Sequence, residues 1–293
     1  MAEDRAEVRL EAAAAASGDD SSTESTRIVI LGVPLDVMNR RQVMIRLLDH
    51  LQSPHEGLLH VVTLNPEYVM AARRDPEFRN AIARAELIVC DGIGTLLAAR
   101  MIPGGSEIQR LTGVEIVKLL VRRTAFHEET GMFLLGGRDA PAAAAGLRRM
   151  MPAAQILGAW SGGTPDAPGD DESIERIVSS GARIAIVGYG APAQVLWIER
   201  NRASLEGAGV RLAVGVGGAL DYFSGHASAA PERVRRLGLE WAYRLVREPW
   251  RWRRQRVLIS FALLTIAHSV RVPAACRILL RRSPETRMQD PSA

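Results

Sequence analysis

The sequence predicts an α/β fold, a parallel β-sheet with helices on both faces, followed by a helical, arginine-rich C-terminal appendage. Three observations predict it. From residue 27 onward, short runs rich in β-branched residues alternate with helical patterns. These runs are apolar throughout, which is typical of strands covered on both faces. Beyond residue 231 the arginines crowd together. The alternation and the continuous apolar runs together indicate a Rossmann-like architecture.

The elements follow from this pattern in chain order. Strands are predicted at 27–32, 58–65, 86–91, 131–137, 154–160, 182–190 and 210–218. Helices are predicted at 40–52, 66–84, 94–101, 113–127, 139–151, 171–180 and 191–204. A further helix is expected from Pro231 to Glu248, where Pro249 should end or bend it.

Composition excludes several classes of protein. With 293 residues, 47% hydrophobic and 24% charged, the chain has material for one large core or two modest ones. Its only cysteines, Cys90 and Cys276, are too few for a disulfide framework, which fits a reducing compartment. The six histidines show no pair at helical ligand spacing, and neither the dinucleotide fingerprint after the first strand nor a P-loop occurs. A reaction without metal or cofactor is expected.

Charge divides the chain into segments. Residues 1–26 have a net charge of −5 and no hydrophobic periodicity, so they are predicted to be a disordered extension and not a secretory signal. The sheet domain, expected over 27–230, is neutral, whereas residues 231–293 have a net charge of +9. Such a tail is expected to meet an anionic partner. We divide it into an arginine-rich helical appendage, 231–256, and a tail, 257–293.

The tail contains fourteen mainly apolar residues, 257–270, between basic flanks. This run is too short to span a bilayer, and no apolar run in the chain approaches the 20 or so residues that a span needs. It suits a helix lying in the interface of an anionic membrane, with Trp250 and Trp252 at headgroup depth. A helix buried against the core is the alternative.

The strand ends carry the predicted chemistry, because ligands of open α/β sheets bind at the carboxyl ends of the strands. The polar residues at these strand ends are Thr63, Asn65 and Asp91. Glycines follow three later strands, at Gly136, Gly137, Gly188, Gly190, Gly217 and Gly218. Glycine allows backbone N–H groups to approach a phosphate, so a nucleotide site is predicted, with ordinary turn chemistry as the alternative.

Several ordered motifs resemble one family. They are TLNPEYVMAARRDPEFRNAIARAELIVCDGIG, RLTGVEIV, FLLGG, VGYGAPAQVLWIERNR, GVGGALDYFSG and APERVRRLGLEWAYRLVREP. Over residues 27–256 the chain resembles the WecG/TagA/CpsF glycosyltransferases, glycosyltransferase family 26. The resemblance implies metal-independent, inverting transfer of a sugar from a UDP-sugar to a polyprenyl-diphosphate-linked monosaccharide in surface polysaccharide biosynthesis. It also implies a peripheral location on the inner face of the bacterial cytoplasmic membrane, and it allows a homo-oligomer.

The resemblance also assigns roles to residues. Asp91 matches the proposed general base, although an aspartate capping the next helix is the alternative. Arg110 matches an arginine that steadies the diphosphate, and the resemblance places Asp221 near the nucleotide. Thr63, Asn65 and Gln194 match substrate contacts. Arginines implicated in catalysis match Arg244, Arg251 and Arg254, whose guanidinium groups suit a diphosphate.

The sequence departs from the family at one motif. Ala193 and Val195 flank Gln194 where the family has lysine and glutamate. UDP-N-acetylmannosamine, UDP-glucose and other UDP-sugars therefore all remain possible donors. A different class of function, a nucleotide- or nucleic-acid-binding protein whose arginine tail tracks phosphates, is the alternative, because tryptophans are interleaved in that tail. Against it, the sheet domain is neutral and contains no recognised nucleic-acid fold.

Overall fold

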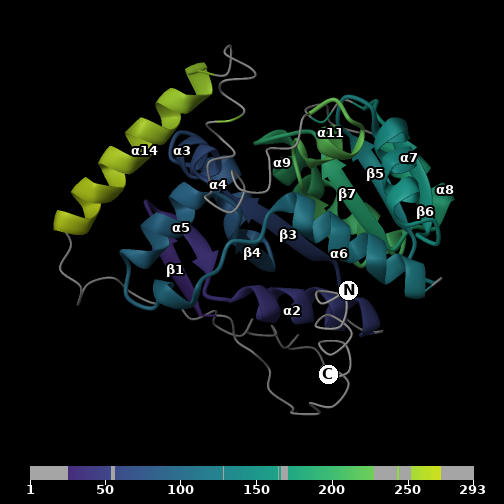
Figure 1. Ribbon diagram of the computed structural model, residues 1–293, viewed down its shortest axis with the longest axis horizontal. Coiled ribbons are helices and arrows are strands. Elements are labelled where there is room, and N and C mark those ends of the chain that lie inside the picture. Colours follow the sequence, from purple (N-terminus) through teal and green to yellow (C-terminus); the bar gives the residue numbers. More distant parts are fainter. Residues whose placement is uncertain are drawn as a thin grey trace, which may run out of the picture.

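A computed structural model describes residues 26–53, 57–127, 129–163, 165, 171–227, 243 and 252–271. Its centre is a six-stranded sheet in the order β4-β3-β8-β7-β5-β6, in which every neighbouring pair is parallel (Figure 1). The strands are β3 (Leu59–Leu64), β4 (Leu87–Cys90), β5 (Met132–Gly136), β6 (Ile156–Trp160), β7 (Ile184–Gly188) and β8 (Leu212–Gly215). The predicted α/β class and parallel sheet are confirmed.

Helices cover both faces of this sheet. On one face lie α2 (Arg40–Gln52), α6 (Gly113–Phe126), α7 (Ala140–Met150) and α11 (Ala219–Phe223). On the other lie α3 (Pro66–Ala72), α4 (Pro76–Arg84), α5 (Ile93–Arg100), α8 (Asp171–Ser180), α9 (Ala193–Arg200) and α10 (Arg202–Gly207). A short 3₁₀ helix, η1 (Gly105–Glu107), follows α5. Buried strands between two helical layers explain why the predicted strands are apolar throughout.

The first predicted strand is present but does not join the parallel sheet. It forms β1 (Arg27–Ile30), which pairs antiparallel with β2 (Val33–Asp36), a strand that the sequence prediction missed. A buried ion pair at 2.8 Å joins Arg27 to Asp36, and Asp36 also accepts the N–H of Ile88 in β4 at 2.6 Å. Hydrogen bonds of this kind dock the hairpin beside the sheet edge, and no local pattern encodes them.

Two long predicted helices are each divided. The prediction at 66–84 becomes α3 and α4, because Asp75 caps the helix that begins at Pro76. The prediction at 191–204 becomes α9 and α10, which meet at Asn201. The short helix α11 was not predicted. The other predicted helices between residues 40 and 180 appear within two residues of their expected ends.

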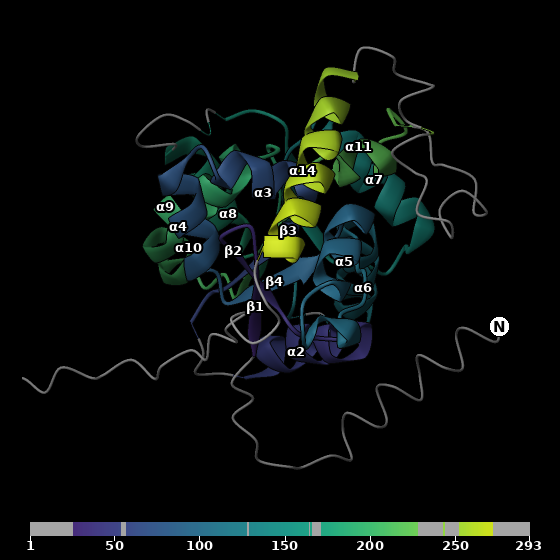
Figure 2. The ribbon, with the colours of Figure 1, turned by 90° about the vertical axis from the view of Figure 1, so that its left-hand side faces the viewer.

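At the C-terminal end, α14 (Trp252–Arg271) lies along α3 and α5 (Figure 2). It runs without a break through residue 256, where we placed a boundary between appendage and tail. Residues 1–25 and nearly all of 231–248 lie outside the described residues, so the disordered extension and the arginine-rich helix stay predictions. In the part of the chain that the structure describes, no helix is long and apolar enough to cross a membrane.

The connections after two neighbouring strands diverge near the middle of the sheet. The chain leaves β3 into α3 on one face, whereas it leaves the neighbouring β8 into α11 on the opposite face. Open α/β sheets bind their ligands at the carboxyl ends of strands whose connections diverge in this way. The strands β3, β4, β7 and β8 end at this edge, and the predicted site residues lie at or just after their carboxyl ends.

Candidate active site

Asp91 begins the loop after β4, at the edge expected for it. Its backbone N–H donates to the carbonyl oxygen of Leu64 at 2.9 Å, so the loop is tied to the end of β3. The N-cap of the following helix α5 is Gly92. Asp91 lies one residue before this position, so it is not the N-cap residue of α5.

The Asp91 loop is pressed against the loop that follows β3. A Cβ atom at Gly92 would lie 2.7 Å from Cδ of Pro66 and 3.1 Å from Cβ of Asn65. At Gly94 it would lie 2.8 Å from Cγ of Pro66. Asn65 is itself fixed as the N-cap of α3. Glycine is needed at 92 and 94 because the two loops approach so closely, and this contact brings Asp91 and Asn65 together.

Positive charge reaches the same strand end. Leu111, the neighbour of Arg110, donates its N–H to the carbonyl oxygen of Cys90 at 2.8 Å. Burial and then the charge of Asp91 raise the pKa of the Cys90 thiol, the charges of Arg110 and Arg100 lower it, and the resulting pKa is about 12. All three charged groups are therefore close enough to act on one thiol. Arg110, predicted to steady the diphosphate, therefore lies near the Asp91 end of β4, and so does Arg100.

Thr63 and Gln194 are more deeply buried than residues expected to contact a substrate. Thr63 is 3% exposed and donates its hydroxyl hydrogen to the carbonyl oxygen of Gly215 at 2.8 Å. Gln194 is fully buried, with its Oε1 accepting the N–H groups of Gly190 and Gly217, each at 2.9 Å. Both residues lie at the predicted edge, where they hold the strand ends and glycine loops in place.

Tyr68 belongs to this network and was missed in the sequence analysis. It is buried in the first turn of α3, and its hydroxyl accepts a hydrogen bond from Nε2 of Gln194. The only sequence signal is its place in TLNPEY, three residues after the cap Asn65. Periodicity alone assigns such a tyrosine to the core, so only the fold brings its hydroxyl to Gln194.

The glycine loops after β5, β7 and β8 meet at the same edge. Gly136, Gly137, Gly190 and Gly217 all have positive φ angles, between 52° and 81°, which favour glycine. The N–H of Gly137 donates to the carbonyl oxygen of Gly188 at 3.1 Å. With the N–H groups of Gly190 and Gly217 held by Gln194, three of the glycine donors expected for phosphate are already bonded within the protein. Side chains must therefore supply much of the charge compensation for a diphosphate.

Asp221 and Gly218 differ in what surrounds them. A carboxylate oxygen of Asp221 accepts the N–H of Arg138 at 3.0 Å, which ties α11 to the loop after β5. Gly218, the N-cap of α11, has an ordinary φ of −72°, and a Cβ there would meet no atom of the residues that the structure describes within 4 Å. Gly218 thus borders open space at the predicted nucleotide edge.

The remaining predicted arginines are largely undescribed. Arg244 and Arg251 lie outside the described residues. Arg254 lies in the first turn of α14.

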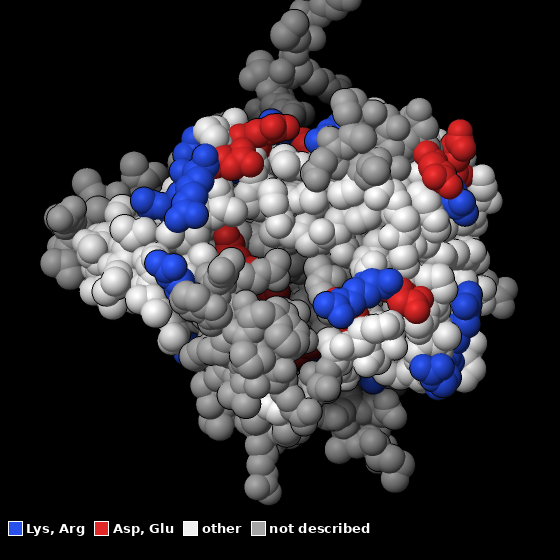
Figure 3. Space-filling view, turned by 90° about the horizontal axis from the view of Figure 1, so that it is seen from above, with Lys and Arg blue, Asp and Glu red and all other residues white. Residues whose placement is uncertain are grey.

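Figure 3 looks down on the side of the molecule where α3 and α11 lie in Figure 1. This face is hollowed near its centre, and acidic side chains lie inside the hollow.

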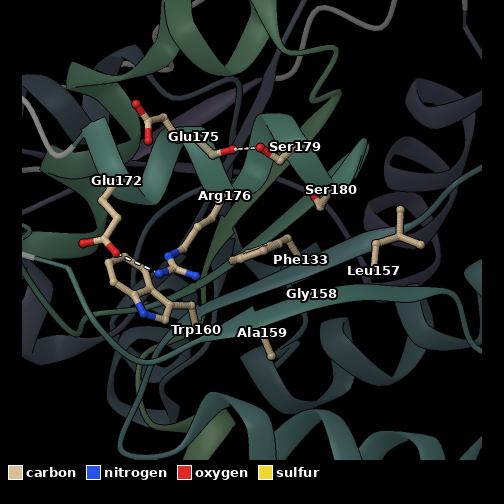
Figure 4. Close-up of a pocket in the computed structure, with 10 residues that line it drawn as sticks. All are labelled: Phe133, Leu157, Gly158, Ala159, Trp160, Glu172, Glu175, Arg176, Ser179 and Ser180. Carbon is tan, nitrogen blue, oxygen red and sulfur yellow. Dashed lines mark hydrogen bonds and ion pairs between the residues drawn. The ribbon is translucent and has the colours of Figure 1, made fainter.

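A separate cavity of about 560 Å³ lies at the other edge of the sheet, between β6 and α8 (Figure 4). The guanidinium of Arg176 stands over the Trp160 ring, 4.5 Å from its centroid, and is 2.8 Å from a carboxylate oxygen of Glu172. None of the predicted site residues lines this cavity. Among the described residues, no three His, Cys, Asp or Glu side chains gather as a metal site.

The model of the glycosyl transferase WecG/TagA/CpsF family matches residues 28–274. The chain belongs to this family. The WecG/TagA/CpsF match includes the parallel sheet and its site edge and extends beyond α14. The protein is therefore a glycosyltransferase of polysaccharide biosynthesis, and a nucleotide-sugar donor and a lipid-linked acceptor are implied in general terms. Membership of this family favours glycosyl transfer over the alternative of a nucleotide- or nucleic-acid-binding protein.

Proposed function

We propose that the protein transfers a sugar, with inversion, from a UDP-sugar to a polyprenyl-diphosphate-linked monosaccharide, and that Asp91 is the general base. The observation that carries this proposal is the position of Asp91. It follows β4, one residue before the N-cap of α5, between the Asn65 loop and the Arg110 segment, in a chain of the WecG/TagA/CpsF family.

The chemistry follows from charge and proton balance. Asp91 takes the proton of the acceptor hydroxyl as that oxygen bonds to the anomeric carbon. On the opposite side the bond from this carbon to the diphosphate breaks, and UDP leaves with the electron pair. Arg110 and Arg100, whose charges act on the Cys90 thiol beside Asp91, meet the charge that develops on the diphosphate.

The donor sugar is left to experiment for a structural reason. Val195, which stands where the family has glutamate, is fully buried in the apolar cluster beneath α3 and α4. Ala193, in place of the lysine, is the first residue of α9. Both changes remove charge beside Gln194, so a donor pocket with a different polar pattern is expected. We propose UDP-glucose and UDP-N-acetylmannosamine as the first donors to compare.

The test is UDP release by detergent-solubilised protein in EDTA, with a panel of UDP-sugars and synthetic polyprenyl-diphosphate sugars as acceptors. Release with one donor–acceptor pair supports the reaction and its independence of metal. Asp91→Asn should abolish turnover and spare donor binding, whereas Asp49→Asn, an exposed carboxylate on α2, should leave both unchanged. Full activity of Asp91→Asn would reject Asp91 as the base, and no release with any pair would reject the proposed reaction.

The membrane association that we propose rests on α14, which has two apolar faces. Phe261, 3% exposed, and Thr265 face inward, and the Phe261 ring comes within 3.7 Å of where a Cβ of Gly94 would lie. Ile259, Leu263 and Ile266 face outward at helical spacing and are 54–64% exposed. We propose that this outward stripe, Ile259/Leu263/Ile266, lies in the anionic headgroup region on the inner face of the cytoplasmic membrane.

Point substitutions test this better than a deletion, because removing α14 would uncover the cluster that Phe261 joins. The triple change of Ile259, Leu263 and Ile266 to serine should weaken co-sedimentation with phosphatidylglycerol vesicles. The control is Phe126→Ser, since Phe126 is 73% exposed at the end of α6. Undiminished binding by the triple variant would contradict the assignment.

A further inference from the structure

Tyr68 is placed to act on the active site without touching substrate. Its ring is buried in α3 and packs against Phe78, with ring centroids 5.6 Å apart. Its backbone N–H is held by the Asn65 side chain at 3.1 Å. The hydroxyl therefore has a fixed position at the carboxyl edge of the sheet, where it meets Gln194.

The side-chain amide of Gln194 has one orientation that satisfies its surroundings. Its oxygen accepts two backbone N–H groups, so its nitrogen must point the other way and needs an acceptor. That acceptor is the Tyr68 hydroxyl. Turned over, the amide would set its NH₂ group against the N–H groups of Gly190 and Gly217, which is repulsive.

The hydroxyl of Tyr68 interacts with both Gln194 and Thr63. Burial and then the charge of Asp91 raise the pKa of Tyr68, whereas the interactions with Gln194 and Thr63 lower it, and the phenol stays protonated. Thr63 donates its own hydroxyl hydrogen to the carbonyl oxygen of Gly215. Gln194, Tyr68 and Thr63 therefore form one buried network that ends on Gly215.

The chain of bonds ends on both glycine loops. Gly190 and Gly217 have φ angles of 79° and 52°, and the Gln194 oxygen fixes the N–H of each. The Gln194 side chain also packs closely against Gly215, since a Cβ atom at Gly215 would come within 2.6 Å of Nε2 of Gln194. One side chain therefore joins the ends of β7 and β8, and its own orientation depends on the Tyr68 hydroxyl.

We infer that Tyr68 is a positioning residue, which orients Gln194 so that a single oxygen pins the Gly190 and Gly217 loops at the edge where the donor binds. Without the hydroxyl, the buried Nε2 of Gln194 loses its acceptor, so one of the three hydrogen bonds that hold the amide is removed. The two loops then loosen while the ring of a phenylalanine still fills the core. The donor-binding part of this inference rests on the proposed function.

The experiment is amide hydrogen exchange, resolved by residue, on the full chain carrying Tyr68→Phe. We expect the N–H groups of Gly190 and Gly217 to exchange at least about tenfold faster than in the wild type, with the Gly137 N–H unchanged. Tyr222→Phe, which removes a hydroxyl from α11, should change none of them. Equal acceleration at all three glycines would mean a general loss of stability, and no acceleration would also overturn the inference.

Kinetics give a second readout. If the loops hold the donor, Tyr68→Phe should raise the donor KM about tenfold. It should lower kcat much less, since the role proposed for Tyr68 is to position the donor loops and not to act on Asp91. In a Gln194→Met background the same change should add little, because Tyr68 acts through Gln194. Additive losses would contradict that route. Absence of turnover in the wild type would reject the proposed function, while the exchange result would still decide the role of Tyr68.

Discussion

Replacing Gly92 with alanine should displace the Asp91 loop without straining the backbone. Gly92 has φ −85° and ψ 140°, angles that alanine adopts freely. The added Cβ would lie 2.7 Å from Pro66 and 3.1 Å from Asn65, whereas ordinary contact begins at 3.4 Å. Relief of the closer contact therefore requires a shift of about 0.7 Å.

The neighbours of Gly92 resist this shift. Pro66 occupies the first position of α3, and the Asn65 cap fixes the same turn. Overpacking of this kind costs about 1–3 kcal/mol, which lowers Tm by about 2–10 °C in a protein of this size. A displacement approaching 1 Å at a catalytic group costs about 100-fold in rate. We expect kcat to fall by about 10- to 100-fold.

The assay is UDP release, measured at a temperature where circular dichroism shows every variant to be fully folded. Gly207→Ala is the control, because it adds the same methyl group at the end of α10 with no atom within 4 Å. Wild-type kcat in folded Gly92→Ala would refute the argument that the loop contact sets the position of Asp91. An equal loss in Gly207→Ala would refute it too.

Three further predictions concern binding and stability. Gly218→Ala, whose methyl group meets no atom of the described residues, should leave Tm unchanged and weaken UDP binding at least about tenfold by calorimetry, if the nucleotide approaches there; an unchanged Kd would contradict that approach. Asp36→Asn should lower the free energy of unfolding by about 3–5 kcal/mol in urea, since Arg27 would stay buried without its charge partner, and an unchanged midpoint would exclude this. Acid should destabilise the fold in two stages. Burial lowers the pKa of His60 below 6.5; burial also raises the pKa of Glu199, but hydrogen bonds with His60 and Arg84 and the charge of Arg202 together hold that pKa at about 2. Both groups bind more protons when unfolded, so unfolding midpoints should fall as pH drops below about 6.5 and again below about 4.5, and a flat profile would refute this.

Much of the fold could be predicted because its signals are local. Continuous apolar runs identified all six strands of the parallel sheet, and amphipathic periodicity identified the helices on both faces. The division of 66–84 was legible in principle, since Asp75 before Pro76 is a helix start. The pairing of β1 with β2 was not, because it depends on the buried bonds of Asp36 and Arg27 to a distant part of the chain.

The candidate site divides in the same way. By itself the sequence determined that polar and glycine residues end the strands, that Asp91 stands at one of those ends, and that the motifs belong together. Only the tertiary structure decided that Asp91 is not the N-cap residue of α5, that Gln194 and Thr63 are buried supports, and that Tyr68 joins them. The physical reason is range: a strand end is marked by its own residues, whereas a hydrogen bond between α3 and α9 joins residues 126 positions apart.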